Sequence, residues 1–190
     1  MRNLMMGRRR EIVPVFIAIA LFTAQTAIAT PDSNSRIVDG IEYYIQTDKS
    51  VYTIGENVEM LYRVTNLSNE DVTFNFPHYP VYKFGAEQEG EQIWFAPGSR
   101  LFVATELTLL PGEFIEFPDD FPPPFVWNMR DNHGNLVDLG NYNMVGGLYD
   151  GFGTYDYTNV AVSIEIIPEP YSFLLLALGG FIIRAKKKSK

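Results

Sequence analysis

Two histidines are the side chains of this chain best suited to acid–base or metal chemistry at neutral pH, because the sequence contains no cysteine. His78 lies in the segment Phe76-Pro77-His78-Tyr79-Pro80, and His133 lies in Asp131-Asn132-His133-Gly134-Asn135. Both segments have the composition of turns. A zinc site needs three or four ligands at suitable spacing, which two separate turns do not supply. We therefore expect both histidines to be solvated turn residues and predict no zinc site.

Carboxylates are the other chemically capable groups. Asp131 to Asp138 has some features of a calcium loop, but with Gly134 as the loop glycine, Met129 falls at the first ligand position and the match fails. Calcium at another acidic turn stays open. Glu87, Glu89 and Glu91 alternate along one segment, which predicts an exposed strand face. Neither a nucleophile motif nor a glycine-rich phosphate loop is visible. The sequence thus predicts a protein that is not an enzyme, with no cofactor and no metal.

The stretch between Thr30 and Pro170 is strongly acidic, with 22 Asp and Glu against six Lys and Arg, a net charge of −16. The whole chain carries only −8, because most basic residues lie in its two end segments. Binding to nucleic acid through phosphates needs clustered Lys and Arg, so nucleic acid is excluded as a partner. Solubility explains this charge more simply than a specific cation-binding role.

The first 29 residues read as a secretory signal peptide. Arginines near the start are followed by an apolar run from Ile12 to Phe22 and by the small-x-small site Ala27-Ile28-Ala29. Cleavage after Ala29 would leave Thr30 as the mature N-terminus. Arg9-Arg10 could also suggest a twin-arginine signal, but the flanking residues match that signal poorly. Export by the ordinary route is the interpretation we favour over a retained N-terminal anchor.

The last residues, 168–190, have three parts in a fixed order. Pro168-Glu169-Pro170 is followed by an uncharged apolar run from Tyr171 to Ile183, and then by a basic end with Arg184, Lys186, Lys187, Lys188 and Lys190. As a helix the apolar run would be roughly 20 Å long, whereas a hydrocarbon core is about 30 Å thick. A short C-terminal transmembrane helix that is recognised and then processed is therefore predicted, with a permanent anchor as the alternative. The basic end would remain on the cytoplasmic side.

This order of parts resembles the PEP-CTERM sorting signal of bacterial envelope proteins. The resemblance implies an exosortase-type sorting enzyme as a partner, acting at Pro168, Glu169 and Pro170. It also implies at least transient contact with the membrane through the C-terminal helix. The expected location is the cell envelope, the cell surface or the extracellular matrix.

Between the two end segments the pattern is β throughout. Residues 30–41 are polar and lack periodicity, so we expect a flexible lead-in. The domain proper is expected at residues 42–167, with no helix, and without cysteine its stability must come from packing. Short Val-, Ile-, Tyr- and Phe-rich runs separated by turn residues predict an all-β, immunoglobulin-like antiparallel β-sandwich. The expected strands are Ile41–Gln46, Val51–Thr53, Val58–Val64, Val72–Phe76, Val81–Phe84, Gln92–Phe95, Leu101–Leu110, Gly112–Phe117, Gly140–Val145 and Asn159–Ile167.

A series of short motifs in this body resembles the BsuPI-type domain, named after an intracellular proteinase inhibitor. The series comprises Thr47-Asp48-Lys49, Tyr52, Gly55-Glu56, Val64-Thr65-Asn66, Gly90, Ile93-Trp94, Pro111-Gly112-Glu113, Trp127, Gly140-Asn141-Tyr142 and Gly146-Gly147. It covers about Glu42 to Ile166. Trp94 and Trp127 are expected core aromatics. The chain departs from the family at Tyr82-Lys83-Phe84 and in the long, proline-rich stretch from Phe117 to Trp127.

Three functions remain open. The first is a non-catalytic interaction module. The second, which the resemblance implies, is a secreted inhibitor of a subtilisin-like protease. Its candidate interaction loop consists of Pro118, Phe121, Pro122, Pro123, Pro124 and Phe125, because consecutive prolines favour a stiff, exposed conformation. The alternative, which we favour, is that this segment is a long loop crossing from one sheet to the other. The third is binding to an envelope polysaccharide through the rings of Tyr149, Phe152, Tyr155 and Tyr157, which could equally pack against the end of the sandwich.

Overall fold

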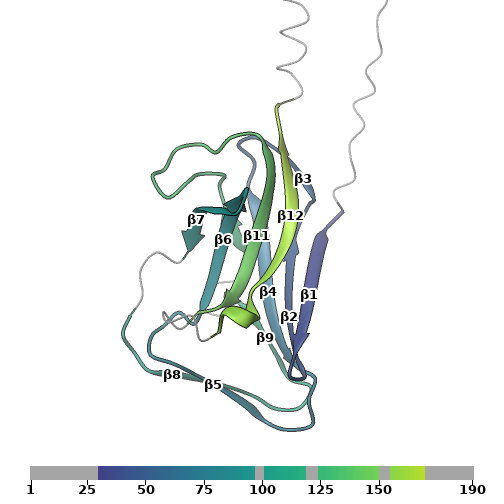
Figure 1. The fold of residues 1–190 in the computed structure, drawn as a ribbon, viewed down its shortest axis with the longest axis vertical. Coiled ribbons are helices and arrows are strands. Elements are labelled where there is room, and N and C mark those ends of the chain that lie inside the picture. The colour runs from purple at the N-terminus through teal and green to yellow at the C-terminus, as the bar shows by residue number, and fades with distance from the viewer. Residues whose placement is uncertain (1–29, 97–100, 119–123, 150–154, 170–190) are drawn as a thin grey trace, which may run out of the picture.

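The computed structural model describes residues 30–96, 101–118, 124–149 and 155–169, and this part of the chain consists mainly of β-strands (Figure 1). Its elements are β1 (Asp32–Val38), β2 (Ile41–Thr47), β3 (Val51–Thr53), β4 (Val58–Asn66), β5 (Val72–Phe76), β6 (Tyr82–Gln88), β7 (Glu91–Ala96), β8 (Thr105–Leu109), β9 (Phe114–Phe117), β10 (Phe125–Trp127), β11 (Gly140–Leu148), the single-turn 3-10 helix η1 (Asp156–Thr158) and β12 (Val160–Ile167).

The strands form two sheets and a two-stranded ribbon. Sheet A has the order β1-β2-β4-β10, and β9 also pairs with β4. Sheet B has the order β3-β12-β11-β6-β7, in which β3 runs parallel to β12. The ribbon of β5 and β8, which we name the arm, extends across the lower end of the two sheets in Figure 1. The predicted all-β class and sandwich-like arrangement are confirmed.

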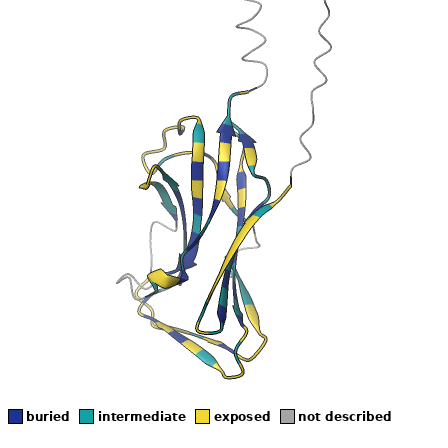
Figure 2. Ribbon diagram, turned by 45° about the vertical axis from the view of Figure 1, so that its right-hand side comes forward, coloured by how far each residue is buried: buried dark blue, intermediate teal, exposed yellow. Residues whose placement is uncertain are grey.

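The core lies between the two sheets, because each long strand points alternate side chains inward. In β2 and β4 every second residue is buried, from Ile41 and Val58 onward, as the banding in Figure 2 shows. Tyr142, Met144 and Ile164 are buried from the side of sheet B. The strong period of two in these strands explains why they were predicted within a few residues of their true bounds.

The predicted flexible lead-in at residues 30–41 was wrong, because β1 occupies most of it. All seven residues of β1 pair with β2 through the turn at Asp39 and Gly40, whose φ angles are 51° and 78°. The Asn34 side chain also donates a hydrogen bond to the Ala161 carbonyl of β12, at 2.8 Å. Backbone pairing, this bond and one from the Thr47 hydroxyl to the Asp32 carbonyl hold an exposed strand that buries little apolar surface, so its sequence shows no hydrophobic period.

Three smaller differences separate the predicted strands from the observed ones. The predicted strand Leu101–Leu110 begins only at Thr105, and Leu101 forms an isolated bridge with Tyr79. The alternating glutamates do not share one strand, because Glu89 and Gly90 form the turn between β6 and β7, with φ angles of 53° and 85°. Strand β10 was not predicted.

Within the described ranges, no helix is long and apolar enough to cross a membrane. The expected signal peptide, with Ala27 and Ala29, and the apolar run from Tyr171 to Ile183 lie outside these ranges, as does Pro170.

Candidate interaction site

Strands β9 and β10 form one interrupted edge strand on β4. Phe117 of β9 pairs with Tyr62, and Phe125 of β10 pairs with Met60, so that only Leu61 of β4 separates the two pairs. The chain therefore leaves this edge of sheet A after Phe117 and rejoins it at Phe125, and we name residues 118–124 the excursion. The sequence indicated an unusually long, proline-rich stretch here, and the register shows that it interrupts a ladder rather than crossing between sheets.

The candidate interaction loop divides into parts that serve the core and parts that face outward. Pro118 is buried, and Phe125 packs its ring against Phe84 and Trp94 at centroid distances of 4.9 and 5.9 Å. Pro124 is exposed. Phe121, Pro122 and Pro123 lie outside the described residues. Neither Pro118 nor Phe125 is thus fully available to a partner.

The two ends of the excursion are anchored in the aromatic core. Phe117 is fully buried and lies 5.4 Å from the ring of Tyr82. Trp127 is buried, stacks on Trp94 at 5.8 Å, and donates its indole N–H to the Arg130 carbonyl at 2.8 Å. Both predicted core tryptophans therefore pack as expected, although Trp94 is only partly buried. A segment attached at both ends to such packed groups has little freedom at its base.

The motifs that carry the family resemblance build turns. Asp48 Oδ1 accepts hydrogen bonds from the Tyr52 hydroxyl at 2.6 Å and from the Glu59 amide at 2.9 Å. Burial raises the pKa of Tyr52, and the neighbouring Asp48 adds to this shift. Glu56 accepts from the Thr53 amide and pairs with Lys49 at 3.2 Å. This network closes the turns on either side of β3 and uses the charges that could otherwise bind a ligand.

A second buried network joins the sheets beneath the glycine pair. The hydroxyl of Tyr62 donates to the Thr158 carbonyl at 3.1 Å, and the Thr158 hydroxyl accepts from the Leu148 amide at 2.9 Å. Burial raises the pKa of Tyr62 well above its usual value. A Cβ at Gly146 would lie 2.8 Å from the Tyr62 ring, so this position requires glycine for close packing.

His78 differs from its prediction as a solvated residue, because it is only 6% exposed. It lies after β5, and its ring stacks on Tyr149, which follows β11, with the centroids 5.5 Å apart. Among the residues that the structure describes, neither ring nitrogen of His78 has a hydrogen-bond partner. The contact joins residues far apart in the sequence, so turn composition alone could not indicate the burial.

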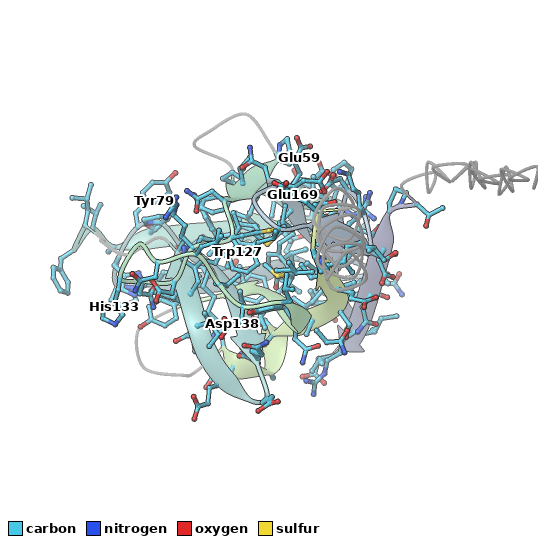
Figure 3. The ribbon with its side chains drawn as sticks, turned by 90° about the horizontal axis from the view of Figure 1, so that it is seen from above. Glu59, Tyr79, Trp127, His133, Asp138 and Glu169 are labelled. Carbon is cyan, nitrogen blue, oxygen red and sulfur yellow. The ribbon has the colours of Figure 1, made fainter. Side chains whose placement is uncertain are left out.

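His133 is the exposed turn residue that was predicted, and Figure 3 shows it near the periphery of the molecule, away from Trp127. Its amide and that of Asn135 both donate to Asp131 Oδ1, at 2.9 and 2.8 Å. The hydrogen bond from the Asn135 side chain, together with these two backbone bonds, lowers the pKa of Asp131. In the described segments, no three His, Asp or Glu side chains are grouped closely enough to hold a metal ion.

The tyrosines proposed for polysaccharide binding are engaged in packing. Tyr155 lies against Phe74 and Phe76 of the arm, at 5.6 and 5.0 Å. Tyr157 is 39% exposed and makes an edge contact with Tyr43 at 6.1 Å. Tyr149 stacks on His78, and Phe152 lies outside the described residues. The described rings therefore pack against the end of the sandwich, which was the alternative to polysaccharide binding.

The two outer ends of the sandwich differ. At one end, which we name the terminal end, Asp32 at the start of β1 pairs with Thr47, and Ile167 at the end of β12 pairs with Thr53. Figure 1 shows β1 beginning and β12 ending at this same end. The turn at Asp39 and Gly40 lies at the opposite end with the arm, and Leu67 donates its amide to the Gly40 carbonyl there.

Comparison with known proteins identifies no family. No family model matches the chain, and no curated protein matches it. Among solved structures, it is similar to the CARDB domain of the PF1109 protein from Pyrococcus furiosus, with 15% identity over 76% of this chain and 100% of that one and a TM-score of 0.37. It is also similar to the sporulation control protein Spo0M from Bacillus subtilis, with 15% identity over 81% of this chain and 56% of that one and a TM-score of 0.42. These distant likenesses carry no functional argument.

Proposed function

We propose that this chain is an exported, non-catalytic β-sandwich interaction module, sorted to the cell envelope or extracellular matrix by its C-terminal Pro-Glu-Pro tail. The observation that carries the proposal is the placement of both outer strand ends, at Asp32 and Ile167, at the terminal end. A chain held through the residues after Ile167 would direct the opposite end and the arm away from its attachment. The resemblance of the tail to the PEP-CTERM signal supports this arrangement.

The use of polar groups in the described structure also favours a non-catalytic role. Asp48, Glu56 and Asp131 bind backbone amides in turns, and Tyr62 is buried. Side chains used in this way stabilise the fold and are not free to act on a substrate.

The C-terminal mass of the mature protein, recovered from the envelope and from the medium of its native host, tests the sorting proposal. We expect a chain that ends at or near Pro168 to Pro170, because an exosortase-type enzyme would cleave there. Replacing Pro168, Glu169 and Pro170 by alanine should leave the tail uncut, whereas Glu165→Ala, an exposed change in β12, should not affect processing. A wild-type chain that retains Lys190 in the membrane would instead indicate a simple anchor.

A second candidate function is inhibition of a subtilisin-like protease. It is favoured by the excursion, whose ends are fixed to β4 on either side of Leu61, because a loop held at its base loses less entropy on binding. Replacing residues 119–123 with glycine and serine should abolish stoichiometric inhibition. The replacement spares Phe125 because this ring belongs to the core. Absence of inhibition by the wild-type protein across several such proteases would eliminate this candidate.

A further inference from the structure

In the described part of the chain, the outer edge of β8 in the arm has backbone groups without hydrogen-bond partners. On β5 the Asn75 amide donates to the Tyr155 hydroxyl at 3.1 Å, and this hydroxyl also lies 3.3 Å from the Asn75 carbonyl, to which it donates. Asn75 therefore directs its backbone groups away from β8. In an antiparallel ladder, residues directly opposite each other exchange both hydrogen bonds or neither, in alternation. Glu106, which lies opposite Asn75, must direct its own amide and carbonyl away from β5.

The same alternation applies two residues further along β8. Thr108 lies opposite Thr73, and their hydroxyl oxygens are 2.8 Å apart, which fits the close approach of a non-hydrogen-bonded pair. The backbone groups of Glu106 and Thr108 thus form the outer edge of β8. In the described part of the chain, no hydrogen bond to these four groups is found.

Two other backbone positions at strand edges are covered, in contrast to those of Glu106 and Thr108. At β7, the Asn132 side-chain oxygen accepts from the Phe95 amide at 3.1 Å, and the Asn132 backbone amide donates to the Ile93 carbonyl at 3.3 Å. Just after β8, the Leu110 amide donates to the Glu113 carboxylate at 2.9 Å. Unpaired strand edges attract other strands, and proteins commonly block them in this way.

The side chains beside the open edge define the chemistry of a partner. Glu106 and Thr108 are exposed on one face of β8, whereas Leu107 on the other face is only partly buried. Apolar side chains also flank the strand, since Phe102 is 94% exposed and Leu110 is 53% exposed. An open hollow of about 570 Å³ lies across one end of the arm, between the end of β5 and the start of β8, and is lined by Asn75, Phe76, Pro77, Ala104, Thr105 and Glu106.

The charge of the arm has one sign. Its described residues and those of the turns around it, 66–76 and 101–113, carry acidic side chains and no Lys or Arg. A strand that pairs with β8 would place alternate side chains beside Glu106 and beside Leu107. Basic residues complement the first position, and apolar residues complement the second.

We propose that the outer edge of β8 is a docking strand for an extended partner segment in which basic and apolar side chains alternate. The segment adds to the arm by backbone hydrogen bonds to Glu106 and Thr108, a recurring mode of peptide recognition. This inference rests on the proposed function as an interaction module and names the surface and the partner chemistry.

The probe is a synthetic seven-residue peptide of alternating lysine and valine, with blocked ends, added to the full chain in detergent. Hydrogen exchange should slow at the amides of Glu106 and Thr108, and unchanged exchange at both would overturn the proposal. A peptide of alternating glutamate and valine is the charge control and should give no protection.

Variants of β8 test whether the peptide binds at this edge or at another surface. Thr108→Pro removes an outward N–H without removing a bond to β5, and it should weaken peptide binding about tenfold or more. Thr108→Val retains the N–H and should bind as the wild type does. If Thr108→Pro fails to fold, Glu106→Lys replaces it and should reverse the preference between the two peptides. If these substitutions do not change peptide binding, the proposal that β8 is a docking strand is overturned. The proposal of a sorted interaction module would stand.

Discussion

At the scale of single residues, the fold depends on close contacts that leave no room for a larger side chain. Gly146 faces the Tyr62 ring inside the sandwich, whereas the adjacent Gly147 lies on the other face of β11. A Cβ at Gly147 would meet the ends of the Asn159 and Lys83 side chains, which can move. The two neighbouring glycines therefore form a matched pair for measuring how rigid the core is.

Gly146→Ala should lower the free energy of unfolding by about 1–3 kcal/mol, the usual cost of overpacking a core. Gly147→Ala should lower it by less, because only mobile side-chain ends must shift. Urea denaturation of both variants measures the difference. Equal losses would show that the core around Tyr62 adapts as easily as the side chains of Asn159 and Lys83 beside Gly147.

Tyr62 gives the protein a predictable response to alkaline pH. Burial raises its folded-state pKa well above the unfolded value of 10.0. Its contribution to stability is therefore complete below pH 10 and is lost as the pH rises from there toward the folded-state pKa. In this window each such tyrosine lowers the free energy of unfolding by about 1.4 kcal/mol per pH unit.

The Tyr62→Phe variant tests this dependence. Above about pH 10, its free energy of unfolding should decline less steeply with pH than that of the wild type, as measured by denaturation. An unchanged dependence of the free energy of unfolding on pH would contradict the raised pKa of Tyr62.

At the scale of elements, prediction from sequence succeeded where a strand is buried on one face. The alternation in β2, β4 and β12 follows from that burial and was visible directly. The polar β1 carries no such signal, because pairing with β2 holds it in place. Strand β10 is short and follows prolines, so its pairing with β4 became evident only from the register. The burial of His78 depends on Tyr149, a contact that no local pattern encodes.

The candidate site was likewise predicted only in part from the sequence. Its prolines and its length were evident from composition, whereas the fixation of its ends at Met60 and Tyr62 required the ladder. The Pro-Glu-Pro tail and the signal peptide remain predictions from motif order alone.

Loss of the Tyr155 hydroxyl should destabilise both strands of the arm together. Tyr155→Phe retains the ring contacts with Phe74 and Phe76 but removes both bonds to Asn75. Hydrogen exchange should accelerate severalfold across β5 and β8, with little change in the two sheets. Tyr44→Phe, which removes a hydroxyl bonded to Gln46 on β2, is the control and should leave the arm unaffected. Uniform acceleration would mean that the arm is not a separate cooperative unit.

At the scale of the whole molecule, the sequence provides a convenient background for mapping orientation, because it contains no cysteine. Val51 lies at the terminal end and is 41% exposed, and Leu67 lies at the opposite end and is 53% exposed. Cysteine introduced at either position can be labelled with a bulky, membrane-impermeant maleimide on intact cells of the native host.

If the tail holds the protein at the membrane, Leu67→Cys should react several times faster than Val51→Cys on cells, because Val51 lies near the attachment. The two variants should react at similar rates after purification. Equal rates on cells would show that the terminal end does not face the membrane.

The interruption between β9 and β10 also has a consequence for engineering. Since the ladder resumes on β4 directly beyond Leu61, the length and composition of the intervening segment are not dictated by strand register. Foreign peptides could be spliced between Pro118 and Pro124 while Phe117 and Phe125 keep their places in the core. If the proposed sorting to the cell surface holds, the chain would then serve as a display scaffold with the foreign peptide placed between β9 and β10.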